Sequence, residues 1–311
     1  MARTYNDKMF IETFEHQFTW LNGFLRNVAR YGGRQAMIDP QTERSWTYTE
    51  LNREANRLAH ALRADGVGKD DVVMTTLLNC PEFAFTYIGP RKVGAILNPA
   101  NFNLAPGEVA LLMDHNRPKV FIYSAEVREM AVQALQLTKY PPARILMADN
   151  LEGAPLPEGH MAYEDYVKGQ PETDPVMDFV PHIYDEVIRL CTSGTTALPK
   201  NAPLNDINDV LSAHDVIMHY PMNVNDDHEH DPLVPPGRLS LRRPRPHLLC
   251  GGLCGCCPAL RAQAVPAVGL EIRRHLPDGR PRLSGDAGPD PGTAARGSEP
   301  SAGAGHHGRP L

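Results

Sequence analysis

The chain has 311 residues, enough to bury a sizeable core, and this length suggests two domains as a starting expectation. The net charge of −6 is mild, but residues 231–311 contain 11 Arg and no Lys, whereas most acidic residues precede them. No apolar run approaches membrane-spanning length and the N-terminus is polar, so we expect a soluble, cytoplasmic protein without a secretion signal or transmembrane segment. Only Cys80 and Cys191 precede residue 231, which argues against a disulfide framework there.

The N-terminal region begins with a predicted helix. Apolar residues at helical spacing indicate a helix over residues 14–28, and Gly32 and Gly33 end it. Two short strands around a turn, 36–38 and 45–47, come next, and a second helix covers residues 51–62.

Strands then alternate with helices up to residue 147. The predicted strands are 72–77, 95–99, 119–123 and 144–147, and the helices between them are 81–93, 106–115 and 127–137. This alternation predicts an α/β fold, with layers of parallel sheet covered by helices. Residues 150–181 form a Pro/Gly-rich connector, and residues 187–190 are the predicted strand before the next feature.

Residues 190–200, Leu-Cys-Thr-Ser-Gly-Thr-Thr-Ala-Leu-Pro-Lys, place four hydroxyl side chains, one Gly and one Lys in a short loop. Backbone N–H groups and hydroxyls can surround the oxygens of a polyphosphate, and an ammonium group offsets their charge. It is not a Walker A loop, because Pro199 replaces the second Gly and Asn201 follows the Lys. The alternative is a solvated Ser/Thr-rich turn, which Lys200 and the preceding apolar strand disfavour.

This loop resembles the phosphate-binding signature of the adenylate-forming (AMP-binding) superfamily, which includes acyl-CoA synthetases, luciferases and peptide-synthetase adenylation domains. The family form is close to YTSGTTGLPKG, so Ala197 and Asn201 stand where the family usually has Gly. Three upstream stretches are similar to acyl-CoA synthetases in the same order, namely residues 46–59, 79–99 and 104–108. The resemblance implies the N-terminal part of the family's large domain, as a partial AMP-binding domain over residues 15–225.

The resemblance implies an acyl-CoA synthetase or fatty-acid–CoA ligase type of activity. Such enzymes use ATP and Mg²⁺ to convert a small carboxylic acid to an acyl-adenylate, and then transfer the acyl group to CoA. We therefore expect ATP, Mg²⁺ and CoA as cofactors and no nucleic-acid partner. By position in the signature, the ATP phosphates would be held by Thr192, Ser193, Gly194, Thr195, Thr196 and Lys200. No metal ligands are predicted, and His214 and His219 are interpreted as ordinary helix-face residues.

Residues 226–311 are a low-complexity tail rich in Arg, Pro and Gly. Residues 231–311 contain 13 Pro and 13 Gly but no Phe, Tyr, Trp, Asn or Lys. Such a segment buries too little apolar surface to offset the entropy of ordering, which predicts disorder. The spacing of its cysteines fits no standard tetrahedral zinc site, and its Arg/Pro cluster at 242–246 is a weak indication of nucleic-acid or SH3 binding.

We interpret this tail as frame-shifted. Translation of GC-rich coding DNA in a shifted reading frame yields a chain rich in Arg, Pro, Gly, Ala and Cys and poor in Lys, Asn and aromatic residues. Permitted codons for residue 228 onward, read one base later, can encode a sequence resembling the synthetase segments that follow the phosphate loop.

The family's later motifs are missing from this reading frame, and no catalytic residue is identifiable. In particular, no Lys follows Lys200, although the family uses a C-terminal catalytic Lys. We therefore expect a truncated, inactive ligase fragment of marginal stability. Two alternatives stay open: a nucleotide-binding module of another adenylate-forming enzyme, and an interaction protein that uses its Arg/Pro-rich tail.

Overall fold

The structure is a computed structural model, and it describes residues 7–39, 41–192, 200–219, 229–230 and 241–242. The chain divides into two compact units, and all of these residues belong to the first, Met1–Val268. Among them, no helix is long and apolar enough to cross a membrane.

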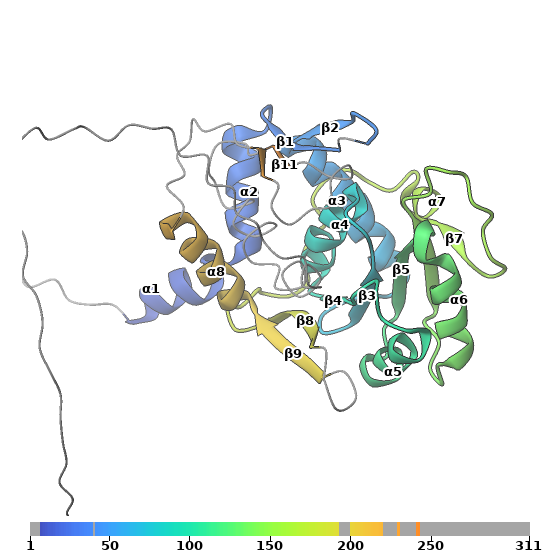
Figure 1. The fold of residues 1–311 in the computed structure, drawn as a ribbon. Coiled ribbons are helices and arrows are strands. Elements are labelled where there is room, and N and C mark those ends of the chain that lie inside the picture. The colour runs from blue at the N-terminus through green and yellow to red at the C-terminus, as the bar shows by residue number, and fades with distance from the viewer. Residues whose placement is uncertain (1–6, 40, 193–199, 220–228, 231–240, 243–311) are drawn as a thin grey trace, which may run out of the picture. The chain divides into compact units, whose positions relative to one another are not determined.

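A seven-stranded sheet organises the described residues, with the strand order β7-β6-β5-β3-β4-β8-β9 (Figure 1). All neighbouring strands are parallel except the last pair, in which β9 runs antiparallel to β8. The strands are β3 (Val72–Thr76), β4 (Ile96–Pro99), β5 (Val120–Ser124), β6 (Arg144–Ala148), β7 (Met161–Ala162), β8 (Glu186–Thr192) and β9 (Lys200–Asn205).

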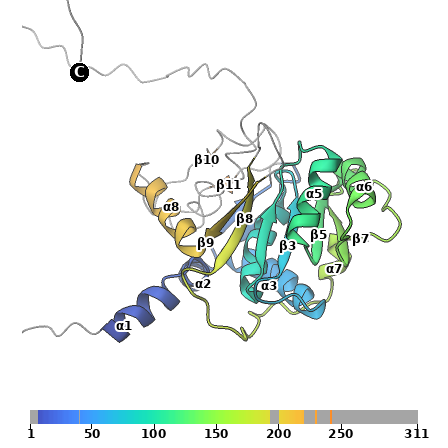
Figure 2. The same cartoon turned by 90° about the horizontal axis from the view of Figure 1, so that it is seen from below.

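Helices cover both faces of this sheet, with α5 and α6 on one side and α2 and α3 on the other (Figure 2). The helices are α1 (Asp7–Ile11), η1 (Glu12–Gln17), α2 (Trp20–Tyr31), α3 (Tyr48–Ala64), α4 (Pro81–Ile88), η2 (Pro90–Val93), α5 (Pro106–Asn116), η3 (Ala125–Val127), α6 (Arg128–Leu137), α7 (Tyr163–Val167) and α8 (Asp206–His219).

The central strands are buried on both faces. Val73 and Ile122 belong to the core shared with α2, α3 and α4, whereas their neighbours Met74 and Phe121 belong to the core under α5 and α6. Successive side chains of a strand point to opposite faces, so a strand between two helical layers reads as a continuous apolar run. The predicted α/β fold with a helix-covered parallel sheet is confirmed.

The predicted hairpin before the second helix is also present. Strands β1 (Gln35–Ile38) and β2 (Ser45–Thr47) pair antiparallel. Thr47 then caps α3: its side chain accepts from the Glu50 amide, and the Glu50 carboxylate accepts from the Thr47 amide. This reciprocal capping box fixes the start of α3.

The helix predicted over residues 14–28 is instead two elements, η1 and α2. Thr19 adopts an extended conformation with φ −94° and ψ 156°, and its Oγ1 accepts a hydrogen bond from the Asn22 amide at 3.3 Å. This N-cap starts a new helix at Trp20, although the apolar spacing continues across the break.

The helix predicted over 81–93 is also divided. The α-helix α4 ends at Ile88, and Pro90 begins the 3-10 helix η2.

Two segments that were predicted to lack regular structure contain short strands or a short helix. The connector predicted over residues 150–181 contains β7 and α7, which are too short to show a clear hydrophobic period. Within the tail, β10 (Glu229–His230) and β11 (Leu241–Arg242) form an antiparallel pair. The other tail residues, including its four cysteines, lie outside the described residues, so its disorder and frame shift stay predictions.

Candidate phosphate-binding hairpin

The predicted phosphate loop joins two paired strands. Strands β8 and β9 are antiparallel, and their register places Thr192 opposite Lys200 and Cys191 opposite Asn201. The first and last of the predicted phosphate-binding residues therefore face each other across the end of a hairpin. The residues between them lie outside the described part of the chain, and they include four predicted site residues, Ser193, Gly194, Thr195 and Thr196.

The hairpin opens at the edge of the sheet where the parallel strands end. Strand β8 pairs parallel with β4, which pairs with β3, and β3 pairs with β5. The carboxyl ends of these four strands therefore lie along one edge. Ligands of open α/β sheets bind outside this edge, and Thr192 and Lys200 both lie at it.

Three Asn side chains connect the base of the hairpin to the sheet. Asn98, a fully buried residue of β4, donates from Nδ2 to the Arg189 carbonyl at 2.6 Å. Asn116, the last residue of α5, donates to Asn98 Oδ1 at 3.0 Å. Asn201 donates from Nδ2 to Asn116 Oδ1 at 2.6 Å. We call Asn98, Asn116 and Asn201 the amide network; it holds the residue after Lys200 to β4 and α5.

Arg189 and Cys191 border this network. The Arg189 guanidinium donates to both carboxylate oxygens of Glu186, at 2.7 and 2.9 Å, and to Asn116 Oδ1 at 3.3 Å. Burial raises the pKa of the Cys191 thiol, against the opposing effect of a hydrogen bond from Asn98. Cys191 is therefore protonated at neutral pH, which argues for packing at the hairpin base and against a nucleophilic role.

Helix α8 follows the hairpin directly and is fixed by buried charges. The Arg91 guanidinium donates to Asp206 Oδ1 at 3.2 Å and to Asp209 Oδ2, and the Trp20 amide donates to Asp206 Oδ2 at 2.7 Å. Burial alone would lower the pKa of Arg91, but the charges of Asp209 and Asp206, the neighbouring Tyr87 and the hydrogen bond to Asp209 together outweigh it and raise that pKa. Burial raises the pKa of Asp206 to about 6, an effect that the Arg91 charge opposes.

The two histidines singled out from the sequence belong to α8. His214 is exposed, in agreement with its interpretation as a helix-face residue, whereas the His219 side chain lies outside the described part.

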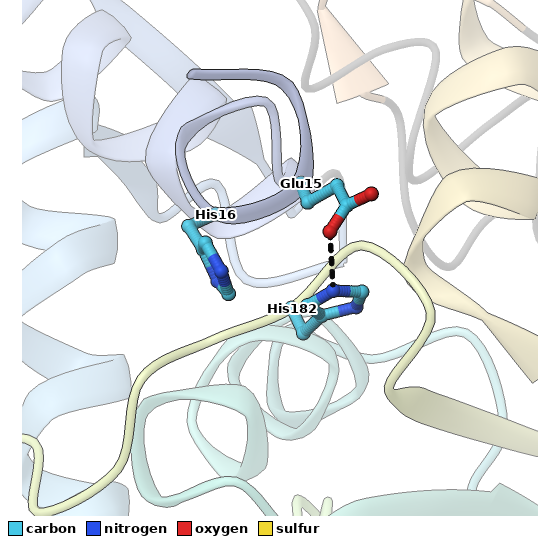
Figure 3. Close-up of side chains that lie close together, drawn as sticks. All are labelled: Glu15, His16 and His182. Carbon is cyan, nitrogen blue, oxygen red and sulfur yellow. Dashed lines mark hydrogen bonds and ion pairs between the residues drawn. The ribbon is translucent and has the colours of Figure 1, made fainter. Parts of the chain in front are cut away.

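The structure also gathers three potential metal ligands that no sequence spacing indicated. Glu15 and His16 of η1 meet His182, which precedes β8, and one ligand atom from each lies within 4.8 Å of the others (Figure 3). Because His182 is far from the other two in the sequence, only the fold brings this group together.

The hydrogen bonds of this cluster already use both ring nitrogens of His182 and Nδ1 of His16. The Tyr184 amide donates to His182 Nδ1 at 3.1 Å, so the neutral ring carries its proton on Nε2, which donates to Glu15 Oε2 at 3.1 Å. His16 Nδ1 lies 3.0 Å from the Pro181 carbonyl and donates to it. A cation at His182 Nε2 would displace a proton and oppose the Tyr184 amide. We therefore assign these residues to joining η1 to the segment before β8.

The sequence of this chain matches that of known ligases. The family model of AMP-binding enzymes matches residues 24–234 of this chain. The 4-coumarate–CoA ligase 3 of Oryza sativa subsp. japonica is 35% identical over 182 residues, 57% of this chain and 30% of the relative. The crotonobetaine/carnitine–CoA ligase of Citrobacter koseri is 33% identical over 183 residues, 57% of this chain and 34% of the relative. The chain thus spans about a third of the length of these relatives.

Solved structures show the same fold. An anthranilate CoA ligase in complex with anthranoyl-AMP superposes with a TM-score of 0.57 at 24% identity, over 63% of this chain and 36% of that one. A fatty acyl CoA synthetase of Mycobacterium tuberculosis gives 0.55 at 23% identity, over 68% of this chain and 38% of that one. With the family match covering more than half of its residues, the chain belongs to the family of AMP-binding enzymes.

Proposed function

We propose that this chain supplies the ATP phosphate-binding part of an acid–CoA ligase. The observation that carries the proposal is the register of the hairpin, which pairs Thr192 with Lys200 at the carboxyl edge of the parallel sheet. The family match and the CoA ligases among the relatives support the same reaction class.

The chemistry explains why such a loop is needed. A carboxylate is a poor electrophile because its oxygen is a poor leaving group. In the proposed reaction, a carboxylate oxygen attacks the α-phosphorus of ATP and pyrophosphate leaves; the CoA thiol then attacks the acyl carbon and AMP leaves. The protein's part in the first step is to hold the triphosphate in line and to stabilise developing charge, while Mg²⁺ bound with the triphosphate offsets its negative charge.

The loop residues have separate roles in this proposal. Gly194 lets the backbone approach the phosphate oxygens closely, and Lys200 supplies a positive charge. The hydroxyl groups donate hydrogen bonds to the β- and γ-phosphates; they belong to Thr192, Ser193, Thr195 and Thr196.

We further propose that these 311 residues alone do not complete the reaction. They span about a third of the length of the relatives, and no Lys follows Lys200 that could act as the family's C-terminal catalytic residue. The composition of residues 231–311 supports a displaced reading frame as the cause. The encoding DNA tests this directly: read one base later from residue 228, it should continue a ligase sequence, and unrelated text would refute the frame shift.

Calorimetric titration with ATP–Mg²⁺, combined with a pyrophosphate-release assay, tests the functional proposal. We expect weak saturable binding that Lys200→Ala reduces about tenfold, corresponding to the loss of one charge-assisted contact. Lys139→Ala, which removes an exposed Lys of a different loop, should leave binding unchanged.

Two results would contradict these proposals separately. Equal ATP affinity in wild type and Lys200→Ala would show that the loop is not the phosphate site. Pyrophosphate release that Lys200→Ala abolishes would support the site and refute the proposed inactivity.

A further inference from the structure

The predicted phosphate loop begins and ends next to one cross-strand pair, Cys191 and Asn201. Cys191 directly precedes Thr192, and Asn201 directly follows Lys200. Asn98 Nδ2 donates to Cys191 Sγ at 3.5 Å, and the Cys191 thiol donates to Asn201 Oδ1 at 3.7 Å. Contacts that fix this pair therefore also fix the two ends from which the loop starts.

Asn116, the last residue of α5, is bonded to both strands of the hairpin. Its Oδ1 accepts from Asn201 Nδ2 of β9 at 2.6 Å and from the Arg189 guanidinium of β8 at 3.3 Å. Its Nδ2 donates to Asn98 Oδ1 of β4 at 3.0 Å. One side chain thus joins α5 to the strand beside the hairpin and to both hairpin strands.

The energetics of buried amides favour a role in geometry for these contacts. Asn116 is 6% exposed and Asn98 is fully buried. The net contribution of a buried hydrogen bond to stability is no larger than that of burying an apolar side chain of similar size. A hydrogen bond, however, forms only within a narrow range of distance and angle. A satisfied network therefore specifies one arrangement of the elements that it joins.

We infer that Asn116 is a positioning residue for the ATP phosphates, acting through the Cys191–Asn201 pair to hold the loop ends in place. The inference rests on the proposed phosphate-binding function of the loop. A loop whose ends are already fixed loses less conformational freedom when a ligand binds, so its affinity is higher. Asn116 supports the site from behind and needs no contact with the phosphates. The Gly usual at position 201 in the resembled signature has no side chain for this contact, so the support is a feature of this chain.

Calorimetric titration of the full chain with ATP–Mg²⁺ tests the inference in two backgrounds. We expect Asn116→Ala to weaken binding about fivefold in the otherwise wild-type chain. Because Asn116 acts through the loop, the same substitution should weaken binding by no more than about twofold in the Lys200→Ala background. A loss of folded protein alone would reduce binding by the same factor in both backgrounds.

Asn56→Ala is the matched control for the loss of a buried amide. Asn56 of α3 is 1% exposed and donates to the Glu172 carbonyl at 2.7 Å, outside the amide network. Its substitution should destabilise the chain but leave ATP affinity unchanged.

Asn201→Ala provides a second variant should Asn116→Ala fail to fold. It removes the partner on the loop side, at a position that is only partly buried. We expect it to weaken ATP–Mg²⁺ binding about fivefold as well, and the two substitutions together should weaken binding no more than the stronger one alone.

The titrations separate failure of this inference from failure of the proposed function. Equal ATP affinity in wild type and Lys200→Ala would contradict the phosphate site and the inference with it. If Lys200→Ala weakens binding but Asn116→Ala and Asn201→Ala do not, only the positioning role is overturned. Weakening by Asn56→Ala, or equal weakening by Asn116→Ala in both backgrounds, would assign the effect to stability and overturn it too.

Discussion

Asn201 and Asn116 join the hairpin to α5: Asn201 Nδ2 donates to Asn116 Oδ1 at 2.6 Å, and Asn116 Nδ2 lies 3.4 Å from Asn201 Oδ1. Asn201 directly follows Lys200, at a position where the resembled signature usually has Gly. The side chain that departs from the signature is therefore the one that fastens the end of the hairpin to the body of the fold. Under the proposed function, this contact fixes the strand that follows the phosphate loop.

Removing this contact should loosen the hairpin. Asn201→Gly loses the two side-chain hydrogen bonds with Asn116 and the one from the Cys191 thiol, and it adds backbone freedom to β9. We therefore expect a loss of about 1–3 kcal/mol in the free energy of unfolding and weaker ATP–Mg²⁺ binding. Urea unfolding and calorimetry measure the two effects. Asn103→Ala is the control, because it removes an exposed amide outside the network. Identical unfolding midpoints for Asn201→Gly and wild type would show that the network does not stabilise the fold.

Arg91 should be among the most sensitive positions in the fold. Its side chain is 2% exposed and pairs with Asp206 and Asp209, whose side chains are 4% and 2% exposed. Arg91→Met keeps most of the volume but leaves both carboxylates buried without their cation. We expect a loss of about 3–5 kcal/mol in the free energy of unfolding, measured by denaturant titration.

Two controls separate charge from packing at this site. Arg26→Met, at an exposed position of α2, should change stability by no more than about 0.5 kcal/mol. Replacing Asp206 and Asp209 by Asn together with Arg91→Met should recover much of the loss, because no unpaired charge then stays buried. A triple variant as unstable as Arg91→Met alone would assign the effect to packing.

Local sequence patterns predict the helices and strands of this fold, but they do not predict the side-chain contacts that join them. The apolar run Val72–Thr76 and the helical spacing of α3 identify their elements without tertiary information. By contrast, the amide network joins residues of β4, α5 and β9, and an Asn carries no periodic signal of its partners. Arg91 shows the same limit, since a basic residue after an apolar helix suggests solvent exposure, but two acids far along the chain meet it inside the core.

The close packing of α3 against the end of α4 requires a residue without a Cβ at Gly89. A Cβ there would lie 2.9 Å from Leu58 Cδ2 and 3.1 Å from the Ala55 carbonyl oxygen. Because that carbonyl belongs to the α3 backbone, it cannot move without shifting the helix. Gly89→Ala should therefore lower the free energy of unfolding by about 1–3 kcal/mol.

Gly107 offers a matched control for this substitution. A Cβ at Gly107, in the first turn of α5, would meet no atom within 4 Å. Gly107→Ala should be neutral or stabilise the chain by up to about 1 kcal/mol, because Ala reduces the freedom of the unfolded chain. Equal thermal unfolding midpoints for the two variants would show that α3 and α4 can separate at no cost.

Glu82 should make the stability of the chain depend on pH. Burial raises the pKa of this carboxyl from 4.5 to about 7 in the folded chain, whereas in the unfolded chain it ionises near its ordinary value. The neutral form is thus the one that suits the fold. Its stabilising contribution is complete below about pH 4.5, falls as the pH rises to about 7, and is lost above that, a total change of about 3 kcal/mol.

The difference between wild type and Glu82→Gln isolates this effect, since every other titrating group, Asp206 included, is common to both proteins. Gln keeps the size of the side chain and carries no charge at any pH. Between pH 4.5 and 7 the free energy of unfolding of wild type should therefore fall relative to that of Glu82→Gln. Urea unfolding at intervals across this range measures the difference. Parallel curves would mean that Glu82 ionises in the folded chain as it does in water.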